Sequence, residues 1–323
     1  MKPSSSLSHL IGYGSAALGA AFFSTKAIFI KLAYQDQVDA SLFLAYRMIF
    51  AAPVFIAIGL WAYARRSVRG EPPPERRAVL SAAFVGFIGY YVASSFDFAG
   101  LQYINASLER LVLFTYPLFV MFIGAAFYGE AITGFGIAAA IVTYIGLGIV
   151  FAVDLPTGGR ATWLGAGLVL GAAISFAWHQ ILAKKVVAEL GSLLFTSIAL
   201  TTAAVFCVLH QIVFGHGFAA TPRFLWLAVG CAIVATVLPT FLISAGLARV
   251  SSQAVSMIST VSPIVTIGLS IAILGEPFTL VDALGSALVL AGVGLFTVGD
   301  KRSAKRAAAE QEAADALAKP TAP

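Results

Sequence analysis

The chain has 323 residues, of which 59% are hydrophobic and only 11% are charged, whereas soluble domains are roughly 25% charged. This composition excludes an ordinary soluble domain and indicates a protein that crosses a membrane several times. The formal net charge is +5, but the basic residues lie beside apolar segments, so we attribute them to membrane topology and expect no nucleic-acid partner. Cys207 and Cys231 fall inside apolar segments, and we expect no disulfide, metal or other cofactor.

Ten apolar segments follow one another along the chain, each long enough to cross roughly 30 Å of hydrocarbon. Their hydrophobic residues are continuous and do not alternate at every second position, which predicts helices and not a membrane barrel. The predicted spans cover residues 10–33, 40–63, 78–99, 103–127, 133–152, 162–182, 192–214, 223–246, 249–274 and 280–299. The expected fold class is an all-α multispanning protein of the cell membrane, with ten transmembrane helices and the lipid bilayer as a partner.

Most of the basic residues that flank these spans fall on one predicted side of the membrane. They are Arg65, Arg66, Arg69, Arg76, Arg77, Lys184, Lys185, Arg249, Lys301, Arg302, Lys305 and Arg306. The opposite side carries Asp36 and Asp39 with few basic residues. Because loops rich in lysine and arginine stay in the cytoplasm, both termini are predicted to be cytoplasmic.

A set of residues recurs 146 positions later in the chain. Gly100-Leu101, Pro117, Gly129-Glu130, Thr133 and the pair Gly146 and Gly148 reappear as Gly246-Leu247, Pro263, Gly275-Glu276, Thr279 and the pair Gly292 and Gly294. Such self-similarity predicts a duplicated unit. Each unit holds five predicted spans, an odd number, so the second must enter the membrane in the opposite orientation. The two inverted repeats are predicted at residues 10–152 and 162–299, followed at residues 300–323 by a cytoplasmic tail that is expected to be disordered.

Two inverted five-helix halves, each with a proline in its fourth helix and a Gly-Glu-x-x-Thr turn before its fifth, resemble the EamA family of the drug/metabolite transporter superfamily. The segments 100–150 and 246–296 carry this resemblance best. The resemblance implies a secondary transporter of amino acids, other metabolites, nucleotide sugars or toxic cations, with no shared catalytic residue. Glu109 and Arg110 depart from the commonest pattern of the family, in which this part of the helix is small and apolar.

Five charged residues fall within four successive predicted spans, at similar depths along their helices. They are Lys26, Arg47, Asp97, Glu109 and Arg110. Because a charge inside a span costs about 2.5 to 3.5 kcal/mol on insertion scales, each needs a partner, water or a function. We expect a hydrated central cavity, whose formal charge of +1 favours an anionic or zwitterionic substrate. The alternative is that the arginines pair with the carboxylates only to lock helices together.

Glu109 and Arg110 are consecutive, so they point about 100 degrees apart on a helix and cannot both face one ligand. We predict that Glu109 faces the cavity, on the same helical face as Asn105. Arg110 is then expected to contact another helix or the substrate. The matching positions of the second half are Val255 and Ser256, so the site is predicted to be asymmetric.

Other polar residues extend the predicted site, each with a simpler structural interpretation beside the functional one. Ser256 belongs to a hydroxyl-bearing face that either lines the path or packs helices closely. His179 matches Lys26 in the repeat; a histidine there is suited to proton transfer, or is an ordinary interfacial residue. Tyr90 shares a helical face with Asp97 and either extends the polar layer or packs as an aromatic.

Pro117 and Pro263 fall within predicted spans, where a proline removes one backbone hydrogen bond and bends the helix. The paired bends are interpreted as gates for alternating access or as fixed kinks that shape a pocket. Glu130 and Glu276 follow glycines that end one helix, and we expect each carboxylate to cap the next helix.

The predicted function is secondary transport of a small polar organic solute, an amino acid or another metabolite, with efflux favoured. Access to a site between the repeats would alternate, in a monomeric or homodimeric assembly. Proton coupling through Glu109 or Asp97 is one hypothesis, and uncoupled exchange is the other. No ATP-binding or catalytic motif is present in the sequence. A non-transporting membrane sensor or assembly protein and, less favoured, an intramembrane enzyme are the alternatives.

Overall fold

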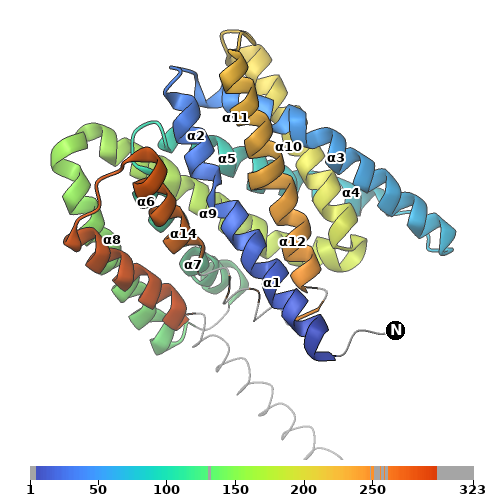
Figure 1. Ribbon diagram of the computed structural model, residues 1–323. Coiled ribbons are helices and arrows are strands. Elements are labelled where there is room, and N and C mark those ends of the chain that lie inside the picture. The colour runs from blue at the N-terminus through green and yellow to red at the C-terminus, as the bar shows by residue number, and fades with distance from the viewer. Residues whose placement is uncertain are drawn as a thin grey trace, which may run out of the picture.

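The computed structural model describes residues 5–129, 132–247, 249–250, 255, 258 and 261–296. Every regular element within these ranges is a helix, and they contain no strand. The helices pack side by side as a bundle, with helices from the two ends of the chain in contact (Figure 1). The all-helical prediction is therefore confirmed for the described part of the chain.

The helices fall into two successive sets. The first set is α1 (Ser5–Ser24), α2 (Lys26–Tyr34), α3 (Ala40–Val68), α4 (Arg76–Gly86), η1 (Phe87–Val92), α5 (Ala93–Gly100), α6 (Ala106–Leu113), α7 (Tyr116–Tyr128) and α8 (Gly134–Gly158). The second set is α9 (Arg160–Leu190), α10 (Ser192–Phe214), α11 (Pro222–Ala232), η2 (Ile233–Val237), α12 (Leu238–Leu247), α14 (Ser262–Leu269), η3 (Ser270–Leu274) and an unlabelled helix at Leu280–Phe296. The elements η1, η2 and η3 are π-helical segments that continue their neighbours.

Eight helical segments of the described chain are long and apolar enough to cross a membrane. They are His9–Tyr34, Ala40–Val68, Arg76–Gly100, Ala106–Tyr128, Gly134–Ala152, Arg160–Leu190, Ser192–Phe214 and Pro222–Gly246. Each coincides with one of the first eight predicted spans. In the region of the last two predicted spans, the described residues form the shorter apolar helices Ser262–Leu274 and Leu280–Phe296.

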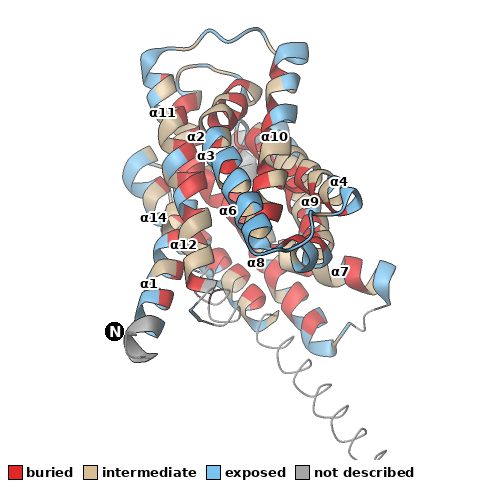
Figure 2. Cartoon of the chain, turned by 90° about the vertical axis from the view of Figure 1, so that its right-hand side faces the viewer, coloured by how far each residue is buried: buried red, intermediate tan, exposed pale blue. Residues whose placement is uncertain are grey.

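The bundle is apolar on its outside and carries charges in its interior. Buried residues gather where helices face one another, whereas outward faces are exposed (Figure 2). These outward faces carry large hydrophobic side chains such as Phe127, Trp226 and Ile137, with exposed fractions of 69%, 76% and 50%. In water such a surface would drive aggregation, so it indicates contact with lipid.

Close contacts between helices occur at glycines, where the missing side chain lets two backbones approach. A Cβ atom added to Gly146 of α8 would come within 2.6 Å of the carbonyl oxygen of Gly285 on the helix Leu280–Phe296. Gly100 of α5 and Gly165 of α9 face each other in the same way. α1 and α12, from opposite ends of the sequence, also lie side by side (Figure 1).

Two of the membrane segments are interrupted in their middle. The first breaks at Thr25, between α1 and α2, and the fourth breaks at Phe114 and Thr115, between α6 and α7. Pro117 was expected to bend a continuous helix, and that expectation is wrong in this detail, because it lies in the first turn of α7. A proline is tolerated there because the first backbone N–H groups of a helix need no intrahelical acceptor. Pro263 likewise lies in the first turn of α14.

The glycines of the repeated turn behave as expected, but the second glutamate does not. Gly129 and Gly275 end their helices in the left-handed conformation, with φ of 69° and 66°. Glu276 was expected to cap the helix that follows it, yet its carboxylate accepts hydrogen bonds from the backbone N–H groups of Ala106 and Ser107, at 2.8 and 3.3 Å. It therefore caps α6 of the other half, which sequence spacing does not reveal.

The helix that follows Glu276 has a cap of its own. The Asp282 carboxylate accepts hydrogen bonds from the backbone N–H and the hydroxyl of Thr279, at 2.7 and 2.8 Å. The Thr279 hydroxyl oxygen in turn accepts a hydrogen bond of 3.2 Å from the backbone N–H of Asp282, and this reciprocal pair satisfies donors at the start of the helix Leu280–Phe296. Glu130, the counterpart of Glu276 in the repeat, lies outside the described residues.

Candidate functional site

A cavity of about 410 Å³ lies at the centre of the bundle, between helices of both halves. Its charged lining consists of Lys26, Arg47, Asp97 and Arg110. Its polar lining includes Tyr90, Ser94, Tyr116, Gln180, Thr196, Thr236, Thr240, Ser244 and Ser262, and aromatic walls are formed by Phe23, Phe114 and Phe176. A volume of this size, with convergent polar groups and aromatic walls, is typical of a site for a small organic molecule.

Four of the five predicted charges form one buried cluster. The Nζ atom of Lys26 lies 2.5 Å from Oδ2 of Asp97 and 3.7 Å from Oε1 of Glu109. Nε of Arg110 lies 4.0 Å from Oε2 of Glu109. The side chains of these residues are at most 7% exposed, so two cations and two carboxylates balance one another away from water. Unpaired, each would carry a large desolvation cost.

Arg110 is also tied to the second half of the chain through hydroxyl groups. Its Nε donates a hydrogen bond of 3.1 Å to Oγ1 of Thr266, which in turn donates to the backbone carbonyl of Ser24 at 3.1 Å. The hydroxyl groups of Ser24 and Ser262 are 2.7 Å apart. Since Ser24 is the last residue before the break between α1 and α2, its carbonyl needs such an outside donor. The break therefore links α1, α6 and α14 at the edge of the cavity.

Arg47 lies apart from this cluster. Its side chain is buried, its Nη2 donates a hydrogen bond of 3.3 Å to the hydroxyl of Ser94, and its guanidinium stacks over Phe98 at 4.8 Å. Among the described residues no carboxylate lies within 4 Å of it, and its Nε has no hydrogen-bond partner. A buried guanidinium with an unused donor is costly unless a ligand completes it.

The orientation predicted for Glu109 is wrong, whereas Arg110 contacts another helix, which is one of its two expected partners. Arg110 lines the cavity, whereas Glu109 is 0% exposed and does not contribute to the lining. The two residues do point to different neighbours, as their spacing requires. Helical spacing alone could not decide which of them faces inward, because the bundle exposes neither face to water.

The remaining predicted site residues divide between the cavity and its surroundings. Tyr90 lines the cavity. His179 is buried behind the lining, with its ring against Tyr90, and its Nδ1 lies 3.1 Å from the carbonyl of Val85. Asn105 caps α6, because its side-chain oxygen accepts a hydrogen bond of 2.6 Å from the N–H of Leu108. The structure thus gives His179 and Asn105 structural contacts outside the cavity.

Ser256, the last predicted binding residue, lies outside the described residues. Pro263 belongs to the same first turn of α14 as the cavity residue Ser262. In the same way, Pro117 directly follows the cavity residue Tyr116. Both prolines therefore stand beside the lining.

One group of lining residues was missed in the sequence. Thr236, Thr240 and Ser244 line the cavity from η2 and α12. Their spacing of four residues places them on one helical face, a signal that was available from the sequence. The hydroxyls of Thr240 and Ser244 donate to backbone carbonyls four residues earlier, both at 2.7 Å. Their oxygen atoms remain suited to accept a hydrogen bond from a ligand.

The described residues contain no group of three or more histidine, cysteine, aspartate or glutamate side chains placed to hold a metal ion. The carboxylates that line or border the cavity are Asp97 and Glu109, and both are within ion-pair distance of Lys26. The chemistry that this arrangement offers is the binding of a charged or polar solute by ion pairs and hydrogen bonds.

Helices of membrane length, an apolar exterior and a charged internal cavity together define a multi-pass membrane protein. The profile of the EamA-like transporter family matches residues 10–152 and matches a second time at residues 163–298. The chain belongs to the EamA-like transporter family, which confirms the resemblance. It is a multi-pass transporter of the cell membrane.

Relatives with curated names are also transporters. The chain is 26% identical over 283 residues to the uncharacterized transporter YcbK of Bacillus subtilis, covering 83% of this chain and 86% of that protein. It is 24% identical over 260 residues to the uncharacterized inner membrane transporter YedA of Escherichia coli, covering 78% and 82% of the two chains. A solved crystal structure aligns with a TM-score of 0.57 at 19% identity, over 92% of this chain and 98% of that chain. That likeness concerns the fold alone.

Proposed function

We propose that this protein is a secondary transporter of small organic solutes that carry a carboxylate, such as amino acids or other metabolites, and that the central cavity is its binding site. The observation that carries the proposal is Arg47, a buried cation in the cavity wall without a carboxylate partner among the described residues. A carboxylate is the ligand that matches the forked geometry of a guanidinium. Export is the expected direction of transport, and it stays a prediction.

A carboxylate in the lining of the same cavity suits a positively charged part of the same solute. Oδ1 of Asp97 is buried without a hydrogen-bond partner, although Oδ2 is paired with Lys26. A solute ammonium group would satisfy this oxygen, while Phe23, Phe114 and Phe176 offer apolar and aromatic surface in the same lining. Together with Arg47, this favours a zwitterion over a simple organic anion.

We further propose ten transmembrane helices in two inverted repeats, and several matched features support this. The contact of Gly100 with Gly165 has a counterpart in that of Gly246 with Gly12, in which the two halves exchange roles. The π-helical segments η1 and η2 begin 146 residues apart. In such transporters a site between the repeats opens alternately to either side as the halves rock.

Coupling to protons is proposed through the carboxylates that share Lys26. Protonation of Asp97 or Glu109 would weaken its ion pair with Lys26 and change the net charge of the cavity. The charged groups that face this pair are Lys26 and Arg110, from α2 and α6. Glu109→Gln is expected to make transport independent of pH, whereas Glu71→Gln, an exposed change outside the cavity, leaves the wild-type profile. If transport by Glu109→Gln keeps the pH dependence of the wild type, Glu109 is not the residue that couples transport to protons.

The transport proposal is tested by counterflow in proteoliposomes that contain the full chain. Amino acids and organic acids are compared with their own amides, together with amines and nucleotides. We expect accumulation of one or more carboxylate solutes and none of the matching amides. Only a carboxylate can form an ion pair with the guanidinium of Arg47. If no solute of any class crosses under any imposed gradient, the protein is not such a transporter and a sensor or assembly role gains support. Transport of amides at equal rates would exclude Arg47 as the specificity group.

A further inference from the structure

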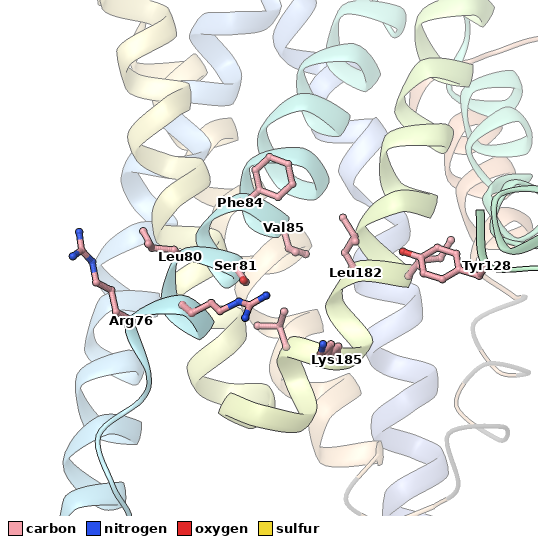
Figure 3. A pocket seen from close by; sticks show the side chains of 11 residues that line it. Arg76, Leu80, Ser81, Phe84, Val85, Tyr128, Leu182 and Lys185 are labelled. Carbon is pink, nitrogen blue, oxygen red and sulfur yellow. The ribbon is translucent and has the colours of Figure 1, made fainter. Parts of the chain in front are cut away.

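A second hollow, of about 800 Å³, lies away from the central cavity on the surface of the bundle, between α4, α9 and the end of α7. Its lining comprises Arg76, Arg77, Leu80, Ser81, Phe84, Val85, Tyr128, Ile181, Leu182, Lys185 and Val186. Figure 3 shows Lys185 toward one end of this groove and Phe84 toward the other, with the Arg76 side chain directed away from both. None of these residues takes part in the proposed transport site.

The basic end of the groove has an excess of positive charge. Arg76, Arg77 and Lys185 are exposed, and among the described residues no carboxylate lies within 4 Å of any of them. Arg76 and Arg77 occupy the first turn of α4, directly after the N-cap residue Glu75, whose side chain makes no capping hydrogen bond and no ion pair with either arginine. Cations are disfavoured at this end of a helix dipole, so an anion beside them would relieve an existing repulsion.

The rest of the groove is apolar and long enough for part of an acyl chain. Leu80 and Phe84 of α4 are each 58% exposed, and Ile181, Leu182 and Val186 of α9 complete the apolar lining. From Arg76 to Val85 the helix rises about 13 Å, close to half of the roughly 30 Å hydrocarbon core. Ser81 and Tyr128 add two hydroxyl groups to the lining, and tyrosine favours the interface between lipid headgroups and hydrocarbon.

We propose that this groove binds one anionic phospholipid of the leaflet on the predicted cytoplasmic side. The phosphate contacts Arg77 and Lys185, the Ser81 hydroxyl donates to it, and an acyl chain runs along Leu80, Phe84 and Leu182. A basic cluster joined to an apolar groove between helices matches both parts of such a lipid. Positive loop charge alone explains topology, but it does not require the charges to converge on a groove.

The test is native mass spectrometry of the full chain in detergent with added phosphatidylglycerol or phosphatidylcholine, and with inorganic phosphate as a competitor. The test variant is the double substitution Arg77→Gln with Lys185→Gln. The matched control is Arg65→Gln with Lys184→Gln, which removes the same charge on the same predicted side from residues outside the groove. A third variant, Arg77→Lys with Lys185→Arg, keeps the charge, and thermal unfolding checks that all variants are folded.

The proposal predicts one tightly held phosphatidylglycerol, weakened about tenfold or more in the test variant and retained in the control and in the charge-keeping variant. Equal weakening in the control would reduce the effect to general surface charge and overturn the proposal. Equal binding of phosphatidylcholine would overturn the anionic selectivity, and displacement by inorganic phosphate would assign the basic end to a free anion. A dimer lost in the test variant would instead assign the groove to a second copy of the chain. Each outcome is independent of transport activity.

Discussion

Lys26 is the residue on which the buried charge cluster depends. It is the cation nearest to both Asp97 and Glu109. Lys26→Met is expected to destabilise the protein by about 3–5 kcal/mol, because it leaves the buried Asp97 without its cation and Glu109 with Arg110 alone. The measurement is thermal or denaturant unfolding in detergent, with Lys184→Met, a change at an exposed lysine outside the cluster, as the control.

The double variant Lys26→Met with Asp97→Asn separates charge from packing. It leaves one carboxylate beside Arg110 and is expected to regain a large part of the lost stability. If the single variant unfolds like the wild type, the cluster contributes no stability and its charges serve another purpose.

At the scale of residues, the sequence predicted the important charges but not their partners. Lys26, Arg47, Asp97 and Arg110 were recognisable because charges inside apolar spans are costly. The isolation of Arg47 and the burial of Glu109 depend on the rotation of each helix about its axis. That rotation is set by packing between distant segments, as in the link from Arg110 through Thr266 to Ser24. It cannot be predicted from the spacing of residues along one helix.

At the scale of elements, the two glycine pairs of the repeat provide a matched comparison. Gly146 and Gly292 are in close contact with the facing helix, whereas Cβ atoms on Gly148 and Gly294 would meet nothing within 4 Å. Gly146→Leu is expected to cost 1–3 kcal/mol or more, in keeping with about that range for overpacking. Gly148→Leu is expected to leave thermal unfolding close to that of the wild type. Similar effects of the two substitutions would mean that α8 does not pack against the helix Leu280–Phe296.

The sequence predicted the elements well and their interruptions less well. The first eight predicted spans coincide with helices of membrane length. A segment of about 20 continuous apolar residues can satisfy its backbone hydrogen bonds in a membrane by forming a helix. The break at Thr25 carries no proline or glycine and was missed; its freed carbonyl at Ser24 is satisfied by Thr266 of a distant helix. The capping of α6 by Glu276 was missed for the same reason, since it joins residues 170 positions apart.

At the scale of the whole molecule, the family and the membrane location were predictable, and the charge of the predicted cavity favoured an anionic or zwitterionic solute without naming the residue that binds it. The repeated Gly-Glu-x-x-Thr turn and the paired prolines identify the family. The solute class depends on which charges remain unpaired after folding. The central claim is therefore that Arg47, the cavity cation without a carboxylate partner among the described residues, binds the carboxylate of a transported solute.

The most direct test is counterflow of a labelled carboxylate solute in proteoliposomes that contain the wild type, Arg47→Gln, Arg47→Lys or Arg65→Gln. We expect Arg47→Gln to lose at least about tenfold in transport, equivalent to one charge-assisted hydrogen bond of about 1.5 kcal/mol or more. Arg47→Lys is expected to retain part of the activity and Arg65→Gln all of it. Transport by Arg47→Gln at the wild-type rate and apparent affinity would contradict the claim.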